Sequence, residues 1–415
     1  MKFKKVNEPI IIRNKDFKRC ILFISFPIKE NDEAKIKILR NIPFNKSAKY
    51  NTEKKMHEIT VNSYCLSYQE RIVQIGKTAF LELEVYFPSK ESLGKDVLED
   101  NLKLIKEIIY NPYLENGAFP EKEINDIREV IKNNINRNFN DAMWYYSYKK
   151  SKIMDENGFL VSKIVENPNL LDAVTPENLY KFYLNIIKDS PIVFLAGNVD
   201  VDSSRKKIKE ILLGNKEEII EFEKKYNNYC KDIPNTPKEV IEKSKFKSTG
   251  VYHNYKIKHL NSERDIILLR IVSELLSSNS SRILIDTLRK ENDLVYRGGA
   301  NYDSEFGSLT LNAITGKDNI KKVEEVYYEV MDKITDISFI EEKLSLIKEE
   351  YKLDDELVKE RIYDILIKDI DKYIELREKS IYETIKEIEA KEVQDFIKNR
   401  LVLVSKYIGV GEENE

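Results

Sequence analysis

The chain has 415 residues, of which 41% are hydrophobic and 34% charged, a composition typical of a globular protein of two or three domains. Its 69 Lys and Arg residues nearly balance its 72 Asp and Glu residues, so no basic field favours nucleic acid or an anionic membrane surface. The longest apolar runs have the length of a strand and cannot span a bilayer.

The amino terminus and the cysteines indicate a cellular location. The first ten residues carry positive charge, but they have neither an apolar run nor a small-residue cleavage site, so they are not a secretory signal. Cys20, Cys65 and Cys230 lie far apart in the sequence and form no C-x-x-C pair. A reducing cytoplasm is therefore the expected location, and the cysteines are expected to be ordinary packing residues.

Strand and helix patterns alternate along the chain. Alternation or β-branched content predicts strands at residues 9–12, 19–27, 80–87, 191–199, 250–257, 294–301, 308–314 and 401–410. Apolar residues at helical spacing predict helices over residues 97–109 and 124–135. Thr175, followed by Pro176, predicts an N-cap at the start of a third helix.

The order of these elements occurs twice. In the first half, a strand at residues 81–85 precedes a helix and then a segment that begins at Phe119. In the second half, a strand at residues 309–313 precedes a helix and then a segment that begins at Phe339. The two phenylalanines are 220 positions apart (339 minus 119), which is the size of a domain. This order favours duplication; chance similarity of two amphipathic stretches is the alternative.

We therefore predict an α+β fold of two homologous domains, each an antiparallel-dominated sheet packed by helices. The first domain is expected at residues 1–205 and the second at residues 245–415. Residues 206–244 are rich in Lys and Glu and lack an apolar stripe after Ile220, so they are expected to connect the domains.

A segment of the second half resembles a known peptidase family. Residues 280–296 place a helix after small residues, then a Leu-Arg pair, and then a tyrosine before a strand. The pattern resembles the opening of the C-terminal domain in pitrilysin/insulinase-type peptidases, and the matching residues are Leu288, Arg289, Glu291, Leu294 and Tyr296. The strand–helix blocks and residues 196–200 are similar to that family as well, so the resemblance spans nearly the whole chain.

Active members of that family hold zinc through H-x-x-E-H on a helix after the first strands, together with a distant Glu. The corresponding stretch here, residues 31–44, contains no histidine. The three histidines of the chain, His57, His253 and His259, stand in no such frame, and Val61 replaces the second ligand of an H-E-x-x-H frame that begins at His57. We expect no metal site or cofactor in this chain, and no peptide cleavage by the chain alone.

The resemblance implies that the chain is the zinc-less subunit of a small bacterial heterodimeric metallopeptidase. Its partner would be a homologous subunit that carries the zinc, and the substrate would be a peptide or a small protein. Arg289 and Tyr296 would act in trans, binding substrate or stabilising the oxyanion. Gly298 and Gly299 would let the following strand approach the substrate backbone closely.

Less specific interpretations stay open at this point. Arg289 can instead pair with a nearby acid, and Tyr296 can simply pack. The chain would then be a catalytically silent peptide-binding or scaffold protein of the same fold. The aromatic residues 143–148 can line a peptide-binding chamber or pack in a core.

Overall fold

The computed structural model describes residues 2–3, 8–13, 15, 17–42, 44–64, 66–75, 78–154, 162–213, 220–221, 236–260, 262–278, 281–303, 306–358 and 381–412. Cys65, Cys230 and Ser280 lie outside these ranges. The chain forms two compact units. Unit 1 takes residues 1–135 and 162–224, and unit 2 takes residues 136–161, 225–357 and 371–415. No helix in the described ranges is both long and apolar enough to cross a membrane.

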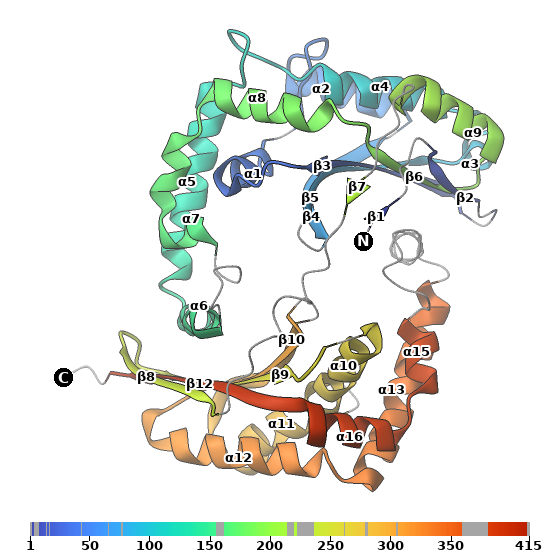
Figure 1. The fold of residues 1–415 in the computed structure, drawn as a ribbon. Coiled ribbons are helices and arrows are strands. Elements are labelled where there is room, and N and C mark those ends of the chain that lie inside the picture. The colour runs from blue at the N-terminus through green and yellow to red at the C-terminus, as the bar shows by residue number, and fades with distance from the viewer. Residues whose placement is uncertain are drawn as a thin grey trace. The chain divides into compact units, whose positions relative to one another are not determined.

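Unit 1 contains a five-stranded sheet in the order β2-β6-β3-β5-β4 (Figure 1). The strands are β2 (Ile10–Arg13), β3 (Arg19–Ile28), β4 (Ser67–Ile75), β5 (Thr78–Pro88) and β6 (Ile192–Gly197). β2 is parallel to β6, and every other neighbouring pair is antiparallel. Its helices are α1 (Glu33–Leu39), α2 (Glu53–Asn62), α3 (Lys90–Leu93), α4 (Leu98–Tyr110), α5 (Glu121–Asn138), α7 (Lys163–Glu166), η1 (Pro168–Ala173), α8 (Pro176–Ile187), α9 (Val201–Ile208) and η2 (Lys209–Leu213).

Unit 2 contains a second five-stranded sheet, in the order β10-β11-β9-β12-β8. The strands are β8 (Lys238–Ser244), β9 (Thr249–Ile257), β10 (Val295–Asp303), β11 (Ser308–Thr315) and β12 (Leu401–Gly411). β8 is parallel to β12, and the other neighbours are antiparallel. Its helices are α6 (Ala142–Met154), α10 (Glu263–Ser277), α11 (Ile283–Ile285), η4 (Asp286–Glu291), η5 (Lys317–Asn319), α12 (Ile320–Lys333), α13 (Ile337–Val358), α15 (Ile381–Glu387) and α16 (Ala390–Arg400). A short pair, β1 (Lys2–Phe3) with β7 (Ile220–Glu221), forms a separate two-stranded sheet.

The two sheets have one topology. Taken in chain order, the five strands of unit 1 and the five strands of unit 2 occupy corresponding positions, and in both sheets the first strand is parallel to the last. The predicted segments at Phe119 and Phe339 are adjacent to α5 and within α13, which follow corresponding strands. The predicted α+β fold with two similar domains is therefore confirmed.

Two strands of the five-stranded sheets, β4 and β8, were not predicted, and both are at an edge of a sheet. β4 and β8 each pair on one side only. β8 reads Lys-Glu-Val-Ile-Glu-Lys-Ser and is largely exposed, which hides it from a search for apolar alternation. It lies within residues 206–244, so the end of the expected connector is a strand of the second sheet.

One face of the second sheet is covered by α10, α12 and α16, whose apolar residues form a buried cluster with Val251, Leu309 and Leu311. Helix α6 packs against the opposite face, on β9 and β12. This helix lies within residues 1–205, where the sequence places the first domain, yet it belongs to unit 2. The reason is a hollow in the sheet at Gly250 and Gly409, which the buried ring of Tyr146 fills. The aromatic stretch is thus partly a core element.

Candidate functional site

The predicted site lies on the segment that joins α10 to β10. Helix α10 ends at Ser277, and the serine hydroxyls beyond it bond to backbone: Ser281 Oγ donates to Leu275 O at 2.6 Å and Ser278 Oγ accepts from Ser281 N–H at 3.0 Å. Helix α11 and the π-helical turn η4 follow directly. The small residues therefore turn the chain tightly before the Leu-Arg pair, as the sequence pattern indicates.

Arg289 is exposed on η4, beside the fully buried Leu288. The alternative that Arg289 pairs with a nearby acid can be compared with the contacts of Asp286 on the same turn. Asp286 contacts Lys290 at 3.0 Å and Arg282 at 3.9 Å, and Arg289 has no ion pair within the described ranges. The buried Leu288 anchors the turn, so the guanidinium projects from a fixed backbone into solvent.

A tight turn then leads from Arg289 into β10. Asp293 adopts a positive φ of 50°, and the Leu294 N–H donates to Leu288 O at 2.9 Å. The Leu294 carbonyl in turn accepts from Thr315 Oγ1 at 2.5 Å. These bonds fasten the turn to β11 and keep Arg289 and Tyr296 on one short, closed segment.

Tyr296 is the extra residue of a β-bulge. The pairing of β10 with β11 jumps from Val295–Thr315 to Arg297–Ile314, so Tyr296 has no partner of its own. Val295 is buried, whereas the Tyr296 side chain is 70% exposed. Bulges of this kind re-aim one side chain out of the regular alternation and are over-represented next to active sites. The interpretation that Tyr296 simply packs does not agree with this exposure.

The surroundings of Gly298 and Gly299 differ. A Cβ at Gly298 would come within 2.9 Å of the Asn312 carbonyl oxygen, so only glycine fits there without a shift of the backbone. At Gly299 the nearest atom to a Cβ is Ser277 Oγ, at an ordinary 3.8 Å. The Gly299 carbonyl also accepts from Asn312 Nδ2 at 3.0 Å and is therefore turned towards β11.

β10 is an edge strand, and part of its free side is covered. The Ala300 N–H donates to Ser277 Oγ at 2.8 Å, and the Ala300 carbonyl accepts from Ser273 Oγ at 3.5 Å. Because backbone direction alternates along a strand, Gly298 is the next residue whose N–H and C=O point to that side. The open part of the edge is thus the stretch from the Tyr296 bulge to Gly298.

The expected position of a zinc motif holds other chemistry. Residues 31–44 include α1, where Asp32 accepts from Lys35 N–H as the N-cap and also contacts Lys35 Nζ at 3.0 Å. Glu33 of this helix accepts from the Lys163 N–H at 3.0 Å and from the Ser162 hydroxyl. No group of three or more His, Cys, Asp or Glu side chains within the described ranges is arranged to hold a metal ion.

The histidines are dispersed. His57 is exposed on α2, and His259 lies exposed in a turn with a positive φ of 56°. His253 is within β9 rather than beside it, fully buried, and its Nε2 lies 3.0 Å from Glu324 Oε1. Neither its position nor its partner is that of a metal ligand in an H-x-x-E-H frame.

One charged cluster of unit 1 was not found from the sequence. Glu82 and Glu84 alternate with apolar residues on β5, which is typical of a solvated face, yet both are buried. Arg71 of β4 contacts Glu82 at 2.6 Å and Glu84 at 3.3 Å, and Ser25 of β3 donates to Glu82 at 2.8 Å. The neighbouring strand supplies the missing charge, and no sequence signal at Glu82 could have shown it.

Comparisons with known proteins agree with this geometry. Residues 173–351 match the family model described as the peptidase M16 inactive domain. The chain is 20% identical over 343 residues to the probable inactive metalloprotease YmfF of Bacillus subtilis (strain 168), which covers 81% of this chain and 80% of that protein.

Solved structures with the same fold come from several bacteria. A conserved protein from Enterococcus faecalis V583 aligns over 100% of both chains with a TM-score of 0.83 and 18% identity. The peptidase M16 inactive domain from Pseudomonas fluorescens aligns over 100% of this chain and 98% of that chain, with a TM-score of 0.67 and 12% identity. Residues 173–351 therefore match a peptidase M16 inactive domain, and the whole chain has the fold of such proteins, in agreement with its resemblance to the pitrilysin/insulinase-type peptidases.

Proposed function

We propose that this chain is the non-zinc subunit of a heterodimeric M16 metallopeptidase, inactive alone, that completes the peptide-cleaving site of a homologous H-x-x-E-H partner. The observation that carries the proposal is the bulge at Tyr296. It presents a phenol at 70% exposure on the same closed segment as the exposed Arg289. An aromatic side chain placed in this way loses the burial that would stabilise the fold, which is reasonable where the ring and hydroxyl contact another molecule.

The two side chains suit a peptide carbonyl. The guanidinium of Arg289 is always charged and offers planar donors, and the phenol of Tyr296 adds a single hydroxyl donor. Donors that are fixed before reaction and aimed at the oxygen that becomes negative stabilise the transition state more than the substrate. In this proposal the partner supplies the zinc, and this chain supplies the second set of oxyanion or substrate contacts.

The open edge of β10 suits the substrate backbone. An extended peptide that follows an exposed strand edge exchanges main-chain hydrogen bonds with it. Gly298 offers backbone groups on that side and carries no side chain to hold the peptide away. Gly299, which is turned towards β11, would act by allowing the strand to keep this path. The substrate class is a peptide or small protein, and the proposed location is the cytoplasm.

The second candidate is a catalytically silent peptide-binding or scaffold protein. It is favoured by the description of the B. subtilis relative as probably inactive. Both candidates keep the peptide-sized strand edge, and only the first needs the Arg289 and Tyr296 donors. They differ in whether a zinc-bearing homologue depends on this chain for activity.

Reconstitution tests the proposal. The chain would be co-expressed with a homologous H-x-x-E-H protein from the same genome, and the mixture analysed by size-exclusion chromatography with light scattering. We expect a stable heterodimer, with an interface above about 2,000 Å² if the pairing is obligate. Peptide cleavage is expected only when both chains are present. Two monomer peaks, or full activity of the zinc-bearing protein alone, would rule out the role of a completing subunit.

A further inference from the structure

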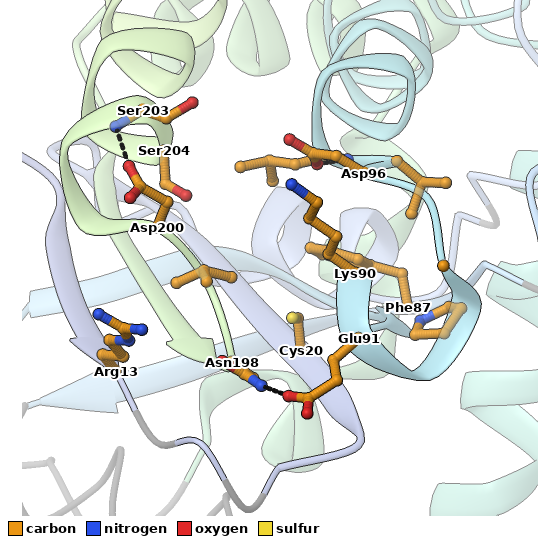
Figure 2. Close-up of a pocket in the computed structure, with 15 residues that line it drawn as sticks. Arg13, Cys20, Phe87, Lys90, Glu91, Asp96, Asn198, Asp200, Ser203 and Ser204 are labelled. Carbon is orange, nitrogen blue, oxygen red and sulfur yellow. Dashed lines mark hydrogen bonds between the residues drawn. The ribbon is translucent and has the colours of Figure 1, made fainter.

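Unit 1 contains a pocket of about 580 Å³, and no residue of the segment that carries Arg289 and Tyr296 lines it. One wall is the first turn of α9, and the other is α3 with the loop that follows it (Figure 2). Cys20 of β3 is at the floor, and Arg13 is at the end of β2. The volume is that of a small-molecule site.

The backbone arrangement at this pocket is one that commonly receives ligands. β2 and β6 are parallel, and their carboxyl ends, Arg13 and Gly197, are paired side by side. The chain passes from β6 through Asp200 directly into α9. Crevices at the carboxyl ends of parallel strands, beside the amino terminus of the next helix, favour negatively charged groups because backbone N–H groups and the helix dipole point there.

Gly197 is required for this arrangement. Its φ is +153°, and a Cβ there would lie 2.5 Å from Cys20 Sγ. Burial raises the pKa of Cys20 to about 12, so the thiol at the floor is neutral and does not repel an anion.

The carboxylates that line the pocket are already engaged. Asp96 contacts Lys207 at 2.6 Å, Asp200 accepts from the Ser203 N–H at 2.8 Å, and Glu91 accepts from the Asn198 amide. The positively charged side chains that line the pocket differ from these carboxylates. Arg13 and Lys90 form no ion pair within the described ranges, and Lys90 extends towards Asp96, which Lys207 already holds (Figure 2).

The side chain of Ser204 also supports the presence of a ligand in this pocket. Ser204 is 3% exposed, and its side chain is directed into the pocket (Figure 2). Its Oγ has no hydrogen-bond partner among the residues that the structure describes. The hydroxyl is therefore available to a ligand oxygen between α9 and α3.

We propose that this pocket binds a small ligand through an anionic group, a phosphate or a carboxylate, held by Arg13 and Lys90 with the Ser204 hydroxyl as a further donor. The site is independent of the proposed peptidase function, because it involves no residue of the segment 286–303. All the residues that line it belong to unit 1.

Isothermal titration of the full chain with inorganic phosphate and, separately, with sodium acetate tests the proposal and distinguishes the two chemistries. We expect saturable binding of at least one anion at one site per chain. Arg13→Gln should weaken it about tenfold and Ser204→Ala by a smaller factor. Lys206→Gln is the matched control, because Lys206 is on the same helix, its side chain is 75% exposed, and it does not line the pocket.

Each outcome decides the proposal. Binding of phosphate alone, of acetate alone or of both, with the Arg13→Gln loss and an unchanged Lys206→Gln control, supports the site and identifies its ligand class. Absence of saturable binding for both anions overturns it, as does an equal loss in the Arg13→Gln and Lys206→Gln variants, which would indicate general charge attraction. Circular dichroism melting curves confirm that each variant is folded.

Discussion

The ring of Tyr146 occupies the space directly above Gly409, where a Cβ atom would lie 2.4 Å from Tyr146 Cε1. The Tyr146 hydroxyl donates to Ser244 Oγ at 2.9 Å on the same sheet. Thus a helix encoded in the first half of the chain packs as a structural part of the second sheet. Glycine at position 409 is what makes this contact possible.

Gly409→Ala should therefore destabilise unit 2. The added methyl group overpacks the site, which typically costs about 1–3 kcal/mol. Gly316→Ala is the matched control, because no atom lies within 4 Å of a Cβ at that position. Urea unfolding followed by circular dichroism measures both variants. Equal midpoints for the two would show that α6 does not depend on this contact.

This contact illustrates what the sequence could and could not predict. The buried strands β3, β6, β9 and β12 were predictable because their apolar and β-branched runs need a core on both faces. The position of α6 was not, because its sequence has no pronounced apolar stripe that indicates a packing partner. Only the pairing of Tyr146 with the hollow at Gly250 and Gly409 selects the second sheet.

The candidate site likewise has one feature that the sequence predicted and one that it did not. The spacing from Arg289 to Tyr296 was visible in the sequence, and the residues between them are consistent with a helix, a turn and a strand. The bulge that exposes Tyr296 was not visible, because a bulge is a property of the register between β10 and β11. Register depends on residues far along the chain, such as Thr315, which no local pattern contains.

Acidification should destabilise unit 2 through His253 and Glu324. Burial lowers the pKa of His253, so the unfolded chain takes up that proton first as the pH falls below about 6.5. The hydrogen bond from His253, together with Lys406, lowers the pKa of Glu324 to about 2 against the effect of burial. The unfolded chain therefore protonates this carboxyl first between about pH 4.5 and pH 2. Both groups stabilise the fold at neutral pH and lose that contribution in acid.

Urea unfolding at a series of pH values measures this effect. The free energy of unfolding should fall as the pH drops below about 6.5 and continue to fall below pH 4.5, with Glu324 contributing on the order of 2 kcal/mol. Glu324→Gln should flatten the lower part of the curve. Glu325→Gln on the same helix, where the glutamate is 3.9 Å from Lys321 and 63% exposed, should leave the curve unchanged. Parallel curves for wild type and Glu324→Gln would contradict the assignment.

The isolated chain should bind no stoichiometric zinc and should cleave no peptide. The reason is that residues 31–44 contain no histidine and that Asp32 and Glu33 of α1 are already bonded to Lys35 and Lys163. Elemental analysis after dialysis against trace zinc tests the first expectation, and incubation with a peptide library followed by mass spectrometry tests the second. One tightly held zinc ion per chain would contradict the expected absence of a zinc site.

The last prediction concerns the donors themselves. In a reconstituted complex, Tyr296→Phe removes one hydroxyl and keeps the ring, and Arg289→Lys keeps the charge and removes the planar donor pair. If these groups stabilise the oxyanion, each change should lower single-turnover cleavage about a hundredfold to a thousandfold. Both side chains are exposed in this chain, so neither change should alter its own stability.

Two conservative variants serve as matched controls. Arg282→Lys changes an arginine that contacts Asp286 at 3.9 Å on the same segment, and Tyr328→Phe changes a tyrosine that is 48% exposed on α12. Both should cleave at the parental rate. A higher KM with unchanged turnover in the Tyr296 and Arg289 variants would mean that these residues bind substrate and transition state equally. If both variants assemble normally and cleave at the parental rate, the donors are unused. The chain would then act as a scaffold. In that case the bulge exposes Tyr296 for a contact outside the cleavage site.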